Sequence, residues 1–288
     1  MAARLDWSSD WPAPAKINLF LHVVGRRADG YHLLQTVFRF LDVSDYLRFA
    51  PRNDGEIVQN SPLPGVAPGQ DLTVRAACAL QAASGVRQGV SITLDKRLPL
   101  GGGLGGGSSD AATTLLALNH LWQCGLSRTD LGKIGLRLGA DVPVFIHGHS
   151  AFGEGVGELL TDVNPPPAWY LVLTPAVAVS TAEIFSAAEL RRDTPAILPG
   201  DWQPGSFGKY GGNGLEAVTC RRYPEVALHL TWLRTLEGAS RVAMSGSGAC
   251  CFAEFGAEAP ARMALMRLPH DMRGFVCCGV DVHPLAQM

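Results

Sequence analysis

The sequence lacks the features by which several common classes of protein are recognised. Its seven cysteines include two adjacent pairs but no Cys-x-x-Cys spacing, so we expect reduced core cysteines in a cytoplasmic protein rather than disulfides or a zinc site. The first ten residues contain no apolar stretch, which argues against a secretory or transit peptide. The longest apolar run, residues 169–179, is too short to span a bilayer and contains Pro175.

An excess of charge of one sign is also lacking. The chain has 24 basic and 26 acidic residues, a net charge of −2, and its arginine pairs at 191–192 and 221–222 are isolated. Without a basic patch, we expect neither a nucleic-acid nor a membrane partner. With 288 residues, 47% of them hydrophobic, the chain is long enough for one large or two moderate globular domains.

Glycine, by contrast, is concentrated in one stretch. Six of the seven residues at 101–107 are glycine. Because glycine costs ~0.5–1 kcal/mol relative to alanine in regular structure, such a run predicts a loop that takes positive φ angles and lets a ligand approach its amides. Residues 108–110, Ser-Ser-Asp, are preferred N-cap residues, and apolar residues at helical spacing follow as far as Trp122. A glycine loop that leads into a helix N-terminus is typical of phosphate binding.

The details of this loop exclude two familiar phosphate-binding motifs. A Walker A loop ends in Gly-Lys-Ser or Gly-Lys-Thr, but Gly107 stands where the lysine would be. The dinucleotide fingerprint follows a strand directly, yet six residues separate the expected strand at 90–94 from the glycine loop. A flexible linker is disfavoured because Pro99-Leu100 and a capped amphipathic helix flank the run.

The rest of the chain predicts an α+β protein in which antiparallel or mixed strands are covered by helices. The segment Asn-Pro-Pro-Pro-Ala at 164–168, with its three consecutive prolines, indicates a boundary between domains, and residues 192–214 read as an irregular loop. We expect strands at 12–24, 46–49, 90–94, 170–179, 240–245, 249–255 and 274–280, an apolar run at 33–41, and helices at 71–83, 111–122, 127–138, 181–190, 224–236 and 260–268.

A few polar residues stand at positions that admit two interpretations. Lys16 and Asn18 share one face of the first strand, where they either face solvent or belong to a site. Tyr31 and His32 follow an Asp-Gly turn, which suits either packing at a rim or a platform for a stacked base. Asp141 interrupts an apolar stretch, so it is either a turn or N-cap aspartate or a paired functional carboxylate.

Five motifs in a fixed order resemble the GHMP kinase superfamily. They are Pro-Ala-Lys-Ile-Asn-Leu at 14–19, Asp-Gly-Tyr-His-Leu-Leu-Gln-Thr-Val at 29–37, the glycine motif at 99–111, Gly-Ala-Asp-Val-Pro at 139–143, and Ser-Gly-Ser-Gly-Ala at 245–249. The resemblance covers residues 14–280. Within the superfamily, the motif at 29–37 is similar to members whose substrate is a cytidine diphosphate-linked methylerythritol.

The resemblance implies a two-domain α+β GHMP kinase fold with an active-site cleft between the domains. The implied division is an N-terminal ATP-binding domain at 12–164 and a C-terminal substrate-side domain at 165–288, preceded by a disordered extension at 1–11. We expect a monomer or weak homodimer, and ATP with Mg²⁺ that is carried by the nucleotide rather than by dedicated protein ligands.

The implied reaction is ATP-dependent phosphorylation of the substrate's 2-hydroxyl, in non-mevalonate isoprenoid precursor synthesis. Asp141 would take the proton of this hydroxyl, and Lys16 would keep Asp141 ionised and the hydroxyl in line. The alternatives are another GHMP small-molecule kinase, of the mevalonate or homoserine type, and a catalytically silent nucleotide-binding regulator.

The resemblance also assigns binding residues. Two positions depart from the pattern: Asp71 replaces an asparagine at the adenine pocket, and Ser186 replaces a lysine that contacts the substrate's diphosphate. The residues implied for ATP are Pro99, Gly101, Gly102, Gly103, Leu104, Gly105, Gly106, Gly107, Ser108 and Ser109. Those implied for the substrate are Tyr31, stacked on cytosine, His32, reading the base edge, and Asn18, Thr181, Phe185, Gly246 and Ser247.

Overall fold

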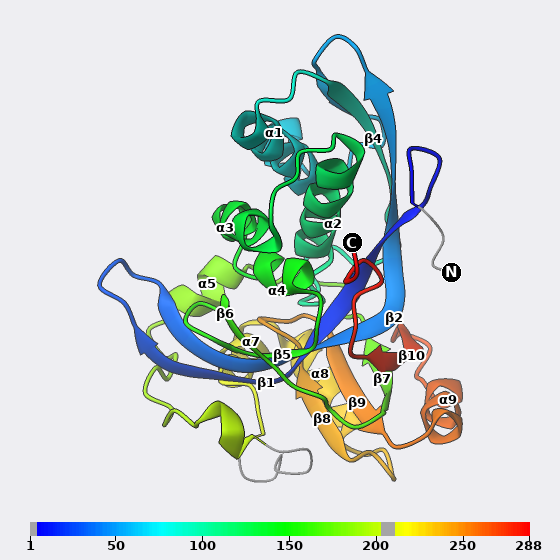
Figure 1. Cartoon of the computed structure of the whole chain (residues 1–288). Helices are drawn as coiled ribbons and strands as arrows, with labels where there is room; N and C mark the ends of the chain where they lie inside the picture. Colours follow the sequence, from blue (N-terminus) through cyan, green and yellow to red (C-terminus); the bar gives the residue numbers. More distant parts are fainter. Residues whose placement is uncertain (1–4, 203–210) are drawn as a thin grey trace.

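The computed structural model describes residues 5–202 and 211–288, and Figure 1 shows the course of the chain. Its strands are β1 (Trp11–Arg26), β2 (His32–Arg52), β3 (Ile57–Gln59), β4 (Gly89–Asp95), β5 (Ala151–Glu154), β6 (Leu159–Asp162), β7 (Trp169–Leu173), β8 (Arg241–Met244), β9 (Cys251–Phe255) and β10 (Gly274–Val280). Its helices are α1 (Leu72–Ser84), α2 (Gly106–Leu121), α3 (Arg128–Leu138), α4 (Val142–His147), α5 (Thr181–Ser186), α7 (Glu216–Arg222), α8 (Pro224–Leu233), α9 (Glu258–Met266) and the 3-10 turns η1 (Pro68–Gln70) and η2 (Pro199–Asp201).

Strand β2 connects the parts of the sheet. The strand order is β3-β4-β2-β10-β7-β9-β8, with β1 and β5 also paired to β2 and β6 paired to β5. β1 and β2 form a long antiparallel hairpin, from Trp11 opposite Leu47 to Arg26 opposite His32. β10 pairs with both β2 and β7, so it joins the N-terminal and C-terminal strands into a continuous sheet (Figure 1).

The expected α+β architecture is confirmed, and most expected elements are present within a few residues. The apolar run at 33–41 and the strand at 46–49 prove to be one strand, β2, of 21 residues. The strand expected at 170–179 ends at Leu173, because Pro175 has no backbone N–H to donate to a neighbouring strand.

The segment that follows β7 is the least regular part of the described chain. Helix α5 ends at Ser186, four residues short of the expected end. Within the irregular stretch at 192–214, residues 203–210 lie outside the described residues, and the described part contains η2. Ile197 is nevertheless tied to β2, because its backbone N–H and carbonyl bond the side-chain amide of Gln35 at 2.9 and 2.8 Å.

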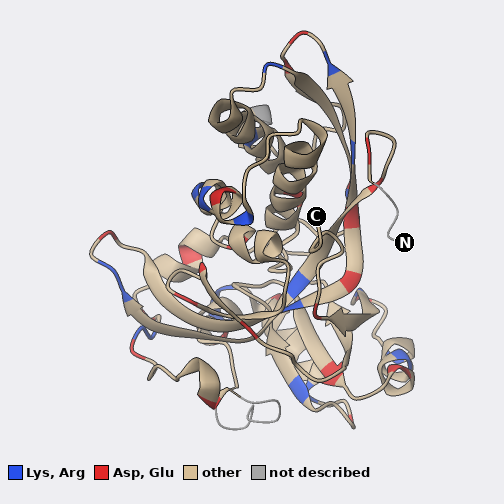
Figure 2. Ribbon diagram, viewed as in Figure 1, with Lys and Arg blue, Asp and Glu red and all other residues tan. Residues whose placement is uncertain are grey.

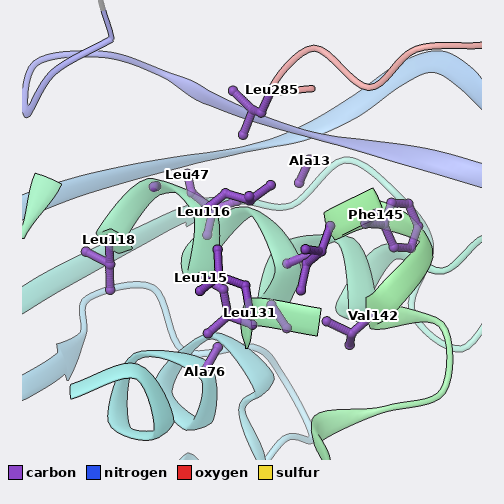
Figure 3. Close-up of a cluster of buried hydrophobic side chains, with 14 of the residues drawn as sticks. Ala13, Leu47, Ala76, Leu115, Leu116, Leu118, Leu131, Val142, Phe145 and Leu285 are labelled. Carbon is purple, nitrogen blue, oxygen red and sulfur yellow. The ribbon is translucent and has the colours of Figure 1, made fainter. Parts of the chain in front are cut away.

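A hydrophobic core surrounds α2, which is buried along most of its length. Figure 3 shows Leu115, Leu116 and Leu118 of this helix between Leu47 of β2 and side chains from α1, α3 and α4. A helix that is buried on nearly all sides, as α2 is, is stable only when other elements enclose it. Packing therefore holds α2, and with it the end of the glycine loop, in a fixed place.

A second core lies under α5, α7, α8 and α9, against β7, β8 and β9. Strand β1 takes part in both cores, because Ala13 packs in the first and Val23 in the second. Figure 1 shows β1 and β2 running through both halves of the molecule. The hairpin thus fixes how the two groups of helices sit relative to each other.

Described residues near both ends of the chain pack against the first core. Leu5 and Trp7 contact this core, and Trp11 is fully buried. The disorder expected for residues 1–11 therefore does not extend to residues 5–11. Residues 1–4 lie outside the described residues. Leu285 belongs to the same core. The last residues therefore cross back from β10 to the half that contains α2.

The buried guanidinium of Arg39 ties the proline segment to the sheet. It donates to the carbonyl oxygens of Pro165 at 2.6 Å and Gly279 at 3.1 Å, and it lies 3.1 Å from the Asp281 carboxylate. Sequence patterns gave no sign of this role, because arginine on a strand usually faces solvent. The expected domain boundary is thus attached to β2 and β10.

Charged residues of both signs are spread over the molecule. Figure 2 shows acidic and basic residues interspersed along the ribbon. All seven cysteines lie in the described part and are free thiols; Cys250, Cys251 and Cys277 are buried, but Cys78 is exposed, so a core position was a wrong prediction for Cys78. Among the described helices, none is long and apolar enough to cross a membrane.

A buried cluster of three charged side chains holds the start of α2. The Lys96 ammonium lies 2.6 Å from the carboxylates of both Asp45 on β2 and Asp110 on α2. Asp45 also accepts bonds from the backbone N–H groups of Arg97 and Leu98. Asp110 has an oxygen without a partner among the described residues. Burial raises the pKa of Asp110 from its ordinary value of 3.8 to about 7, against the opposing effect of Lys96.

We expect Asp110→Asn to leave the free energy of unfolding at pH 8 unchanged or higher, because it removes one of two carboxylates that share one ammonium. The raised pKa of about 7 means that the folded protein retains a proton that the unfolded chain releases above about pH 4. The contribution of Asp110 to the free energy of unfolding therefore falls as the pH rises from about 4 to about 7. The difference in free energy of unfolding between the Asp110→Asn variant and the native protein grows in favour of the variant over the same range. Urea unfolding at several pH values measures both effects.

Asp45→Ala is the contrasting variant. It should lower the free energy of unfolding by roughly 2–4 kcal/mol, because it leaves the two backbone N–H groups without their acceptor and Lys96 with a single partner. Similar losses in both variants would contradict the unequal roles of Asp45 and Asp110.

Candidate active site

Two adjoining cavities form a continuous cleft beside the glycine loop. Their volumes are about 500 and 480 Å³, and they share Leu34, Ala140, Val156, Thr181 and Phe185 in their linings. The larger cavity also brings together the following predicted residues: Lys16, Asn18, Pro99, Gly101, Gly102, Gly103, Leu104, Gly105, Gly106, Gly107, Ser108, Asp141, Gly246 and Ser247. The second cavity contains Tyr31 and His32.

The glycine loop needs glycine for two physical reasons. Gly103 and Gly105 have φ angles of 75° and 72°, which side-chain-bearing residues rarely adopt. A Cβ atom on Gly103 would lie 2.1 Å from the Ser245 carbonyl oxygen, and one on Gly105 would lie 2.9 Å from the Phe145 ring. The loop therefore passes directly against its neighbours, and this approach shapes one wall of the cleft.

Helix α2 begins earlier than the sequence predicted. Gly105 occupies the N-cap position in the left-handed conformation and provides no side-chain cap. The expected cap at 108–110 is wrong, because these residues already lie within the helix and the Asp110 side chain bonds Lys96 instead. The Ser109 N–H donates to the Gly105 carbonyl at 2.8 Å. The earlier amides of the helix have no intrahelical acceptor, so the helix offers them to an anion.

The two serines of this turn lie in different surroundings. Ser108 lines the larger cavity. Ser109 is fully buried, its hydroxyl has no partner among the described residues, and its amide is used within the helix. Of the two, therefore, Ser108 is the one that this structure presents to a ligand.

The Lys16 side chain is buried beneath the glycine loop. Its ammonium lies 2.6 Å from the Asn18 side-chain oxygen, 3.2 Å from the Gly103 carbonyl and 3.1 Å from the Asp141 carboxylate. Irregularities in the β1–β2 pairing stand on both sides of the pair Lys16 and Asn18, and such bulges re-aim side chains. The interpretation of these two residues as solvent-facing is therefore wrong, since both are 2% exposed.

The contacts of Asp141 favour a paired carboxylate over a capping aspartate. It stands at the N-cap position of α4, but its side chain makes no capping hydrogen bond. The carboxylate faces the Lys16 ammonium and is 36% exposed, on the lining of the larger cavity. A carboxylate paired on one side and open to a cavity on the other can accept a proton from a bound molecule.

A chain of hydrogen bonds joins this pair to the surrounding strands. The Asn18 side-chain amide donates to the Thr36 hydroxyl at 2.9 Å, and the Asn18 N–H donates to the Ser245 hydroxyl at 3.2 Å. Ser245 in turn donates to the Gly103 carbonyl at 2.8 Å. Thr36 was not predicted as a site residue, although it lies in the motif at 29–37.

The loop at 246–248 closes the cleft on the side of the C-terminal half. Ser247 and Thr181 are joined by their hydroxyl groups at 2.8 Å. Asn213 donates to the carbonyl oxygens of Met244 at 2.8 Å and Gly246 at 2.7 Å. Sequence reasoning missed Asn213, because it belongs to a stretch interpreted only as a loop.

The second cavity presents aromatic and basic groups. Tyr31 is 62% exposed at its rim, whereas His32 is 9% exposed and its ring lies 4.9 Å from that of Phe185. Burial, with the nearby charges of Arg192 and Arg26, lowers the pKa of His32 below its ordinary value of 6.5. Arg26 lines the same cavity, as does Ser186, the position where the family has a lysine.

The other departure from the family pattern, Asp71, has a local role. Its carboxylate caps α1 by accepting bonds from the N–H groups of Thr73 at 2.8 Å and Val74 at 3.4 Å. Leu72, the next residue, lines the larger cavity, but Asp71 does not. Asp71 therefore orients the start of α1 at the edge of the cleft.

Comparisons with known proteins agree with this geometry. Residues 71–149 match the family model described as GHMP kinases N terminal domain. The chain is 61% identical over 278 residues to the 4-diphosphocytidyl-2-C-methyl-D-erythritol kinase of Dechloromonas aromatica (strain RCB), covering 96% of this chain and 99% of the relative. It is 60% identical over 275 residues to the kinase of the same name from Nitrosospira multiformis, covering 95% of this chain and 92% of the relative.

A solved structure gives the same result at the level of the fold. The crystal structure of a 4-(cytidine 5'-diphospho)-2C-methyl-D-erythritol kinase superposes with a TM-score of 0.81 at 35% identity, covering 94% of this chain and 99% of the other. The similarity in sequence and in fold extends over nearly the whole chain. The chain therefore belongs to the 4-diphosphocytidyl-2-C-methyl-D-erythritol kinase family, a branch of the GHMP kinases.

Proposed function

We propose that this chain transfers the γ-phosphoryl group of ATP to the 2-hydroxyl of 4-diphosphocytidyl-2-C-methyl-D-erythritol. Its family membership makes it an ATP-dependent small-molecule kinase. The observation that carries the proposed chemistry is the pair Lys16 and Asp141, 3.1 Å apart, at the junction of the glycine loop and the cleft. A catalytically silent regulator would have no need of this pair.

The phosphates of ATP are proposed to lie on the glycine loop and the start of α2. This region offers backbone amides, the positive end of the helix dipole and the Ser108 hydroxyl. The small side-chain volume of the loop allows the phosphates to approach the backbone closely. The loop thereby supports the triphosphate opposite Asp141.

In the proposed reaction, the substrate hydroxyl oxygen forms a bond to the γ-phosphorus as the bond from that phosphorus to the bridging oxygen breaks. ADP leaves with the bridging oxygen, and the hydroxyl proton passes to the Asp141 carboxylate. The Lys16 ammonium, fixed by Asn18 and Gly103, orients Asp141 and opposes charge on the reacting oxygens. Most of the catalytic effect of such a site comes from positioning.

The acceptor is proposed to extend from the Lys16–Asp141 pair into the second cavity. Asn18 would position the methylerythritol end, and Thr181 and Phe185, which line both cavities, would contact the middle of the molecule. The cytosine ring would stack on Tyr31 beside His32. Arg26, which lines this cavity, would contact the diphosphate where Ser186 has replaced the family's lysine.

Magnesium is proposed to arrive with ATP. In residues 5–202 and 211–288, no group of three or more His, Cys, Asp or Glu side chains is arranged to hold a metal ion. A nucleotide-borne ion fits this chain, because phosphate oxygens and water supply most ligands of Mg²⁺ in such sites. When bound, the ion would neutralise charge on the phosphates, and Ser108 and Asp141, whose side chains carry oxygen and line the cleft, could contact it.

The division into two domains is proposed to follow the cleft. Residues 12–164 would carry the glycine loop and residues 165–288 the opposite wall at 246–248. The hairpin of β1 and β2 and the returning residues after β10 connect the two parts.

Asp141→Asn should lower kcat by about 10²–10⁴-fold with little change in either KM, because the amide cannot take the hydroxyl proton but keeps the size of the side chain. Steady-state release of ADP measures this change. Asp162→Asn is the matched control, since Asp162 is an exposed carboxylate that pairs with His147 outside the cleft. An Asp141→Asn variant within tenfold of the native kcat would refute the assignment.

Tyr31→Ala should raise KM for the cytidyl substrate about tenfold or more, with KM for ATP unchanged, because stacking on a base contributes about 1–3 kcal/mol. Tyr31→Phe keeps the ring and should restore the native KM. Equal effects of Tyr31→Ala on both substrates would argue against stacking.

The substrate itself is tested with a panel. The protein is assayed for ADP release with 4-diphosphocytidyl-2-C-methyl-D-erythritol, mevalonate and homoserine at equal concentrations. We expect turnover of the cytidyl compound alone. Strong activity on either of the other two alcohols would overturn the proposed specificity.

A further inference from the structure

The imidazole of His32 accepts a hydrogen bond from an arginine that the mechanism above does not use. The Arg192 Nε donates to His32 Nε2 at 2.9 Å. A guanidinium has donors and no acceptor, so the nitrogen that it faces must carry a lone pair rather than a proton. His32 Nε2 is therefore unprotonated, and the proton of the neutral ring is on Nδ1.

Arg192 is itself held rigidly by the end of α5. Its Nη1 donates to the Leu190 carbonyl at 2.9 Å, and its Nη2 donates to the carbonyls of Phe185 at 3.0 Å and Ala187 at 2.7 Å. These bonds leave Nε directed at the histidine. The same segment supplies the Phe185 ring, which packs on the imidazole of His32. Phe185 therefore fixes the orientation of the imidazole, and Arg192 fixes which of its nitrogens carries the proton.

The charges around His32 favour the neutral ring. Arg192 approaches from the segment after α5, and Arg26 stands opposite His32 in the β1–β2 pairing. Asp29 also lines the second cavity, but it pairs with Arg27 at 2.7 Å. Two cations and partial burial disfavour an imidazolium at this position, in accord with the lowered pKa of His32.

The remaining nitrogen is available to a ligand. No described residue bonds His32 Nδ1, and His32 lines the second cavity. We infer that Arg192 is a positioning residue that holds His32 as the neutral Nδ1–H form, so that the ring presents one fixed hydrogen-bond donor to the base in the cavity. This inference rests on the proposed function, in which the base is cytosine. An Nδ1–H donor suits cytosine, because the O2 and N3 atoms of cytosine both accept hydrogen bonds. The N3 atom of uracil carries a proton and does not.

The direct test is nitrogen NMR of the imidazole groups in the whole protein. Histidine is labelled with ¹⁵N, and the His32 signals are assigned by their loss in His32→Gln. We expect native His32 to be protonated at Nδ1 and to titrate below pH 6.5. Arg192→Ala should produce a mixture of the two neutral forms and raise the pKa of His32. Arg191→Ala is the matched control, because Arg191 is exposed and pairs with Asp193, and it should leave the signals unchanged.

Kinetics provide a second readout. Arg192→Ala should raise KM for the cytidyl substrate about tenfold at pH 8, with kcat and KM for ATP unchanged. The defect should shrink toward pH 6, because an imidazolium donates from both nitrogens whatever the arginine does. If Arg192 only stabilised the fold, the KM defect of Arg192→Ala would not change with pH in parallel with the protonation of His32. Arg192→Lys keeps a cationic donor and should recover most of the native Nδ1–H signal.

The outcomes separate this inference from the proposed function. A native His32 protonated at Nε2, or a His32 spectrum that is the same in Arg192→Ala and in the native protein, overturns the inference even if the substrate panel succeeds. An altered spectrum with no change in KM for the cytidyl substrate overturns the part of the inference that concerns the base. Failure of the substrate panel overturns the proposed function. The NMR result would then still report the effect of Arg192 on the protonation of His32, but it would say nothing about a base.

Discussion

The buried ammonium of Lys16 is the constraint on which the site depends. A charge that is 2% exposed is stable only if oxygen atoms surround it, and its partners come from three separate segments: Asn18 on the same strand, Gly103 in the glycine loop and Asp141 at the start of α4. Folding of the loop, the helix and the strand is therefore coupled at one atom. The interaction that stabilises this junction also aligns the carboxylate assigned to the chemistry.

Close approach of backbones explains why this junction needs so much glycine. The loop passes between β1 and the turn after β8, and there is no room for a Cβ atom at Gly103. The Ser245 hydroxyl links the two sides, because it donates to the Gly103 carbonyl and accepts from the Asn18 N–H. The hairpin of β1 and β2 carries Lys16 and Asn18 under the loop, and it continues to His32 at the second cavity. One rigid element thus positions side chains in both cavities of the cleft.

Particular residues show where sequence reasoning succeeded and where it failed. The glycine run and its motifs were sufficient for the family and the fold, because an unusual backbone requires an unusual composition. The same reasoning placed the helix cap at 108–110 and treated Asp110 as a capping residue. Tertiary contacts decided otherwise, since Lys96, which precedes the helix in sequence, draws the Asp110 side chain into a buried ion pair.

By itself, the sequence determined the glycine loop, the α+β architecture and the family, because these depend on local composition and on the order of motifs. The family resemblance already implied the pair of Lys16 and Asp141. Only the tertiary structure decided that the Asp141 carboxylate faces Lys16 without capping its own helix, that Ser108 and not Ser109 lines the cleft, and that Arg192 bonds His32. Each of these depends on the orientation of a side chain toward a residue far away in sequence. Such orientations are set by packing and burial, which no local pattern records.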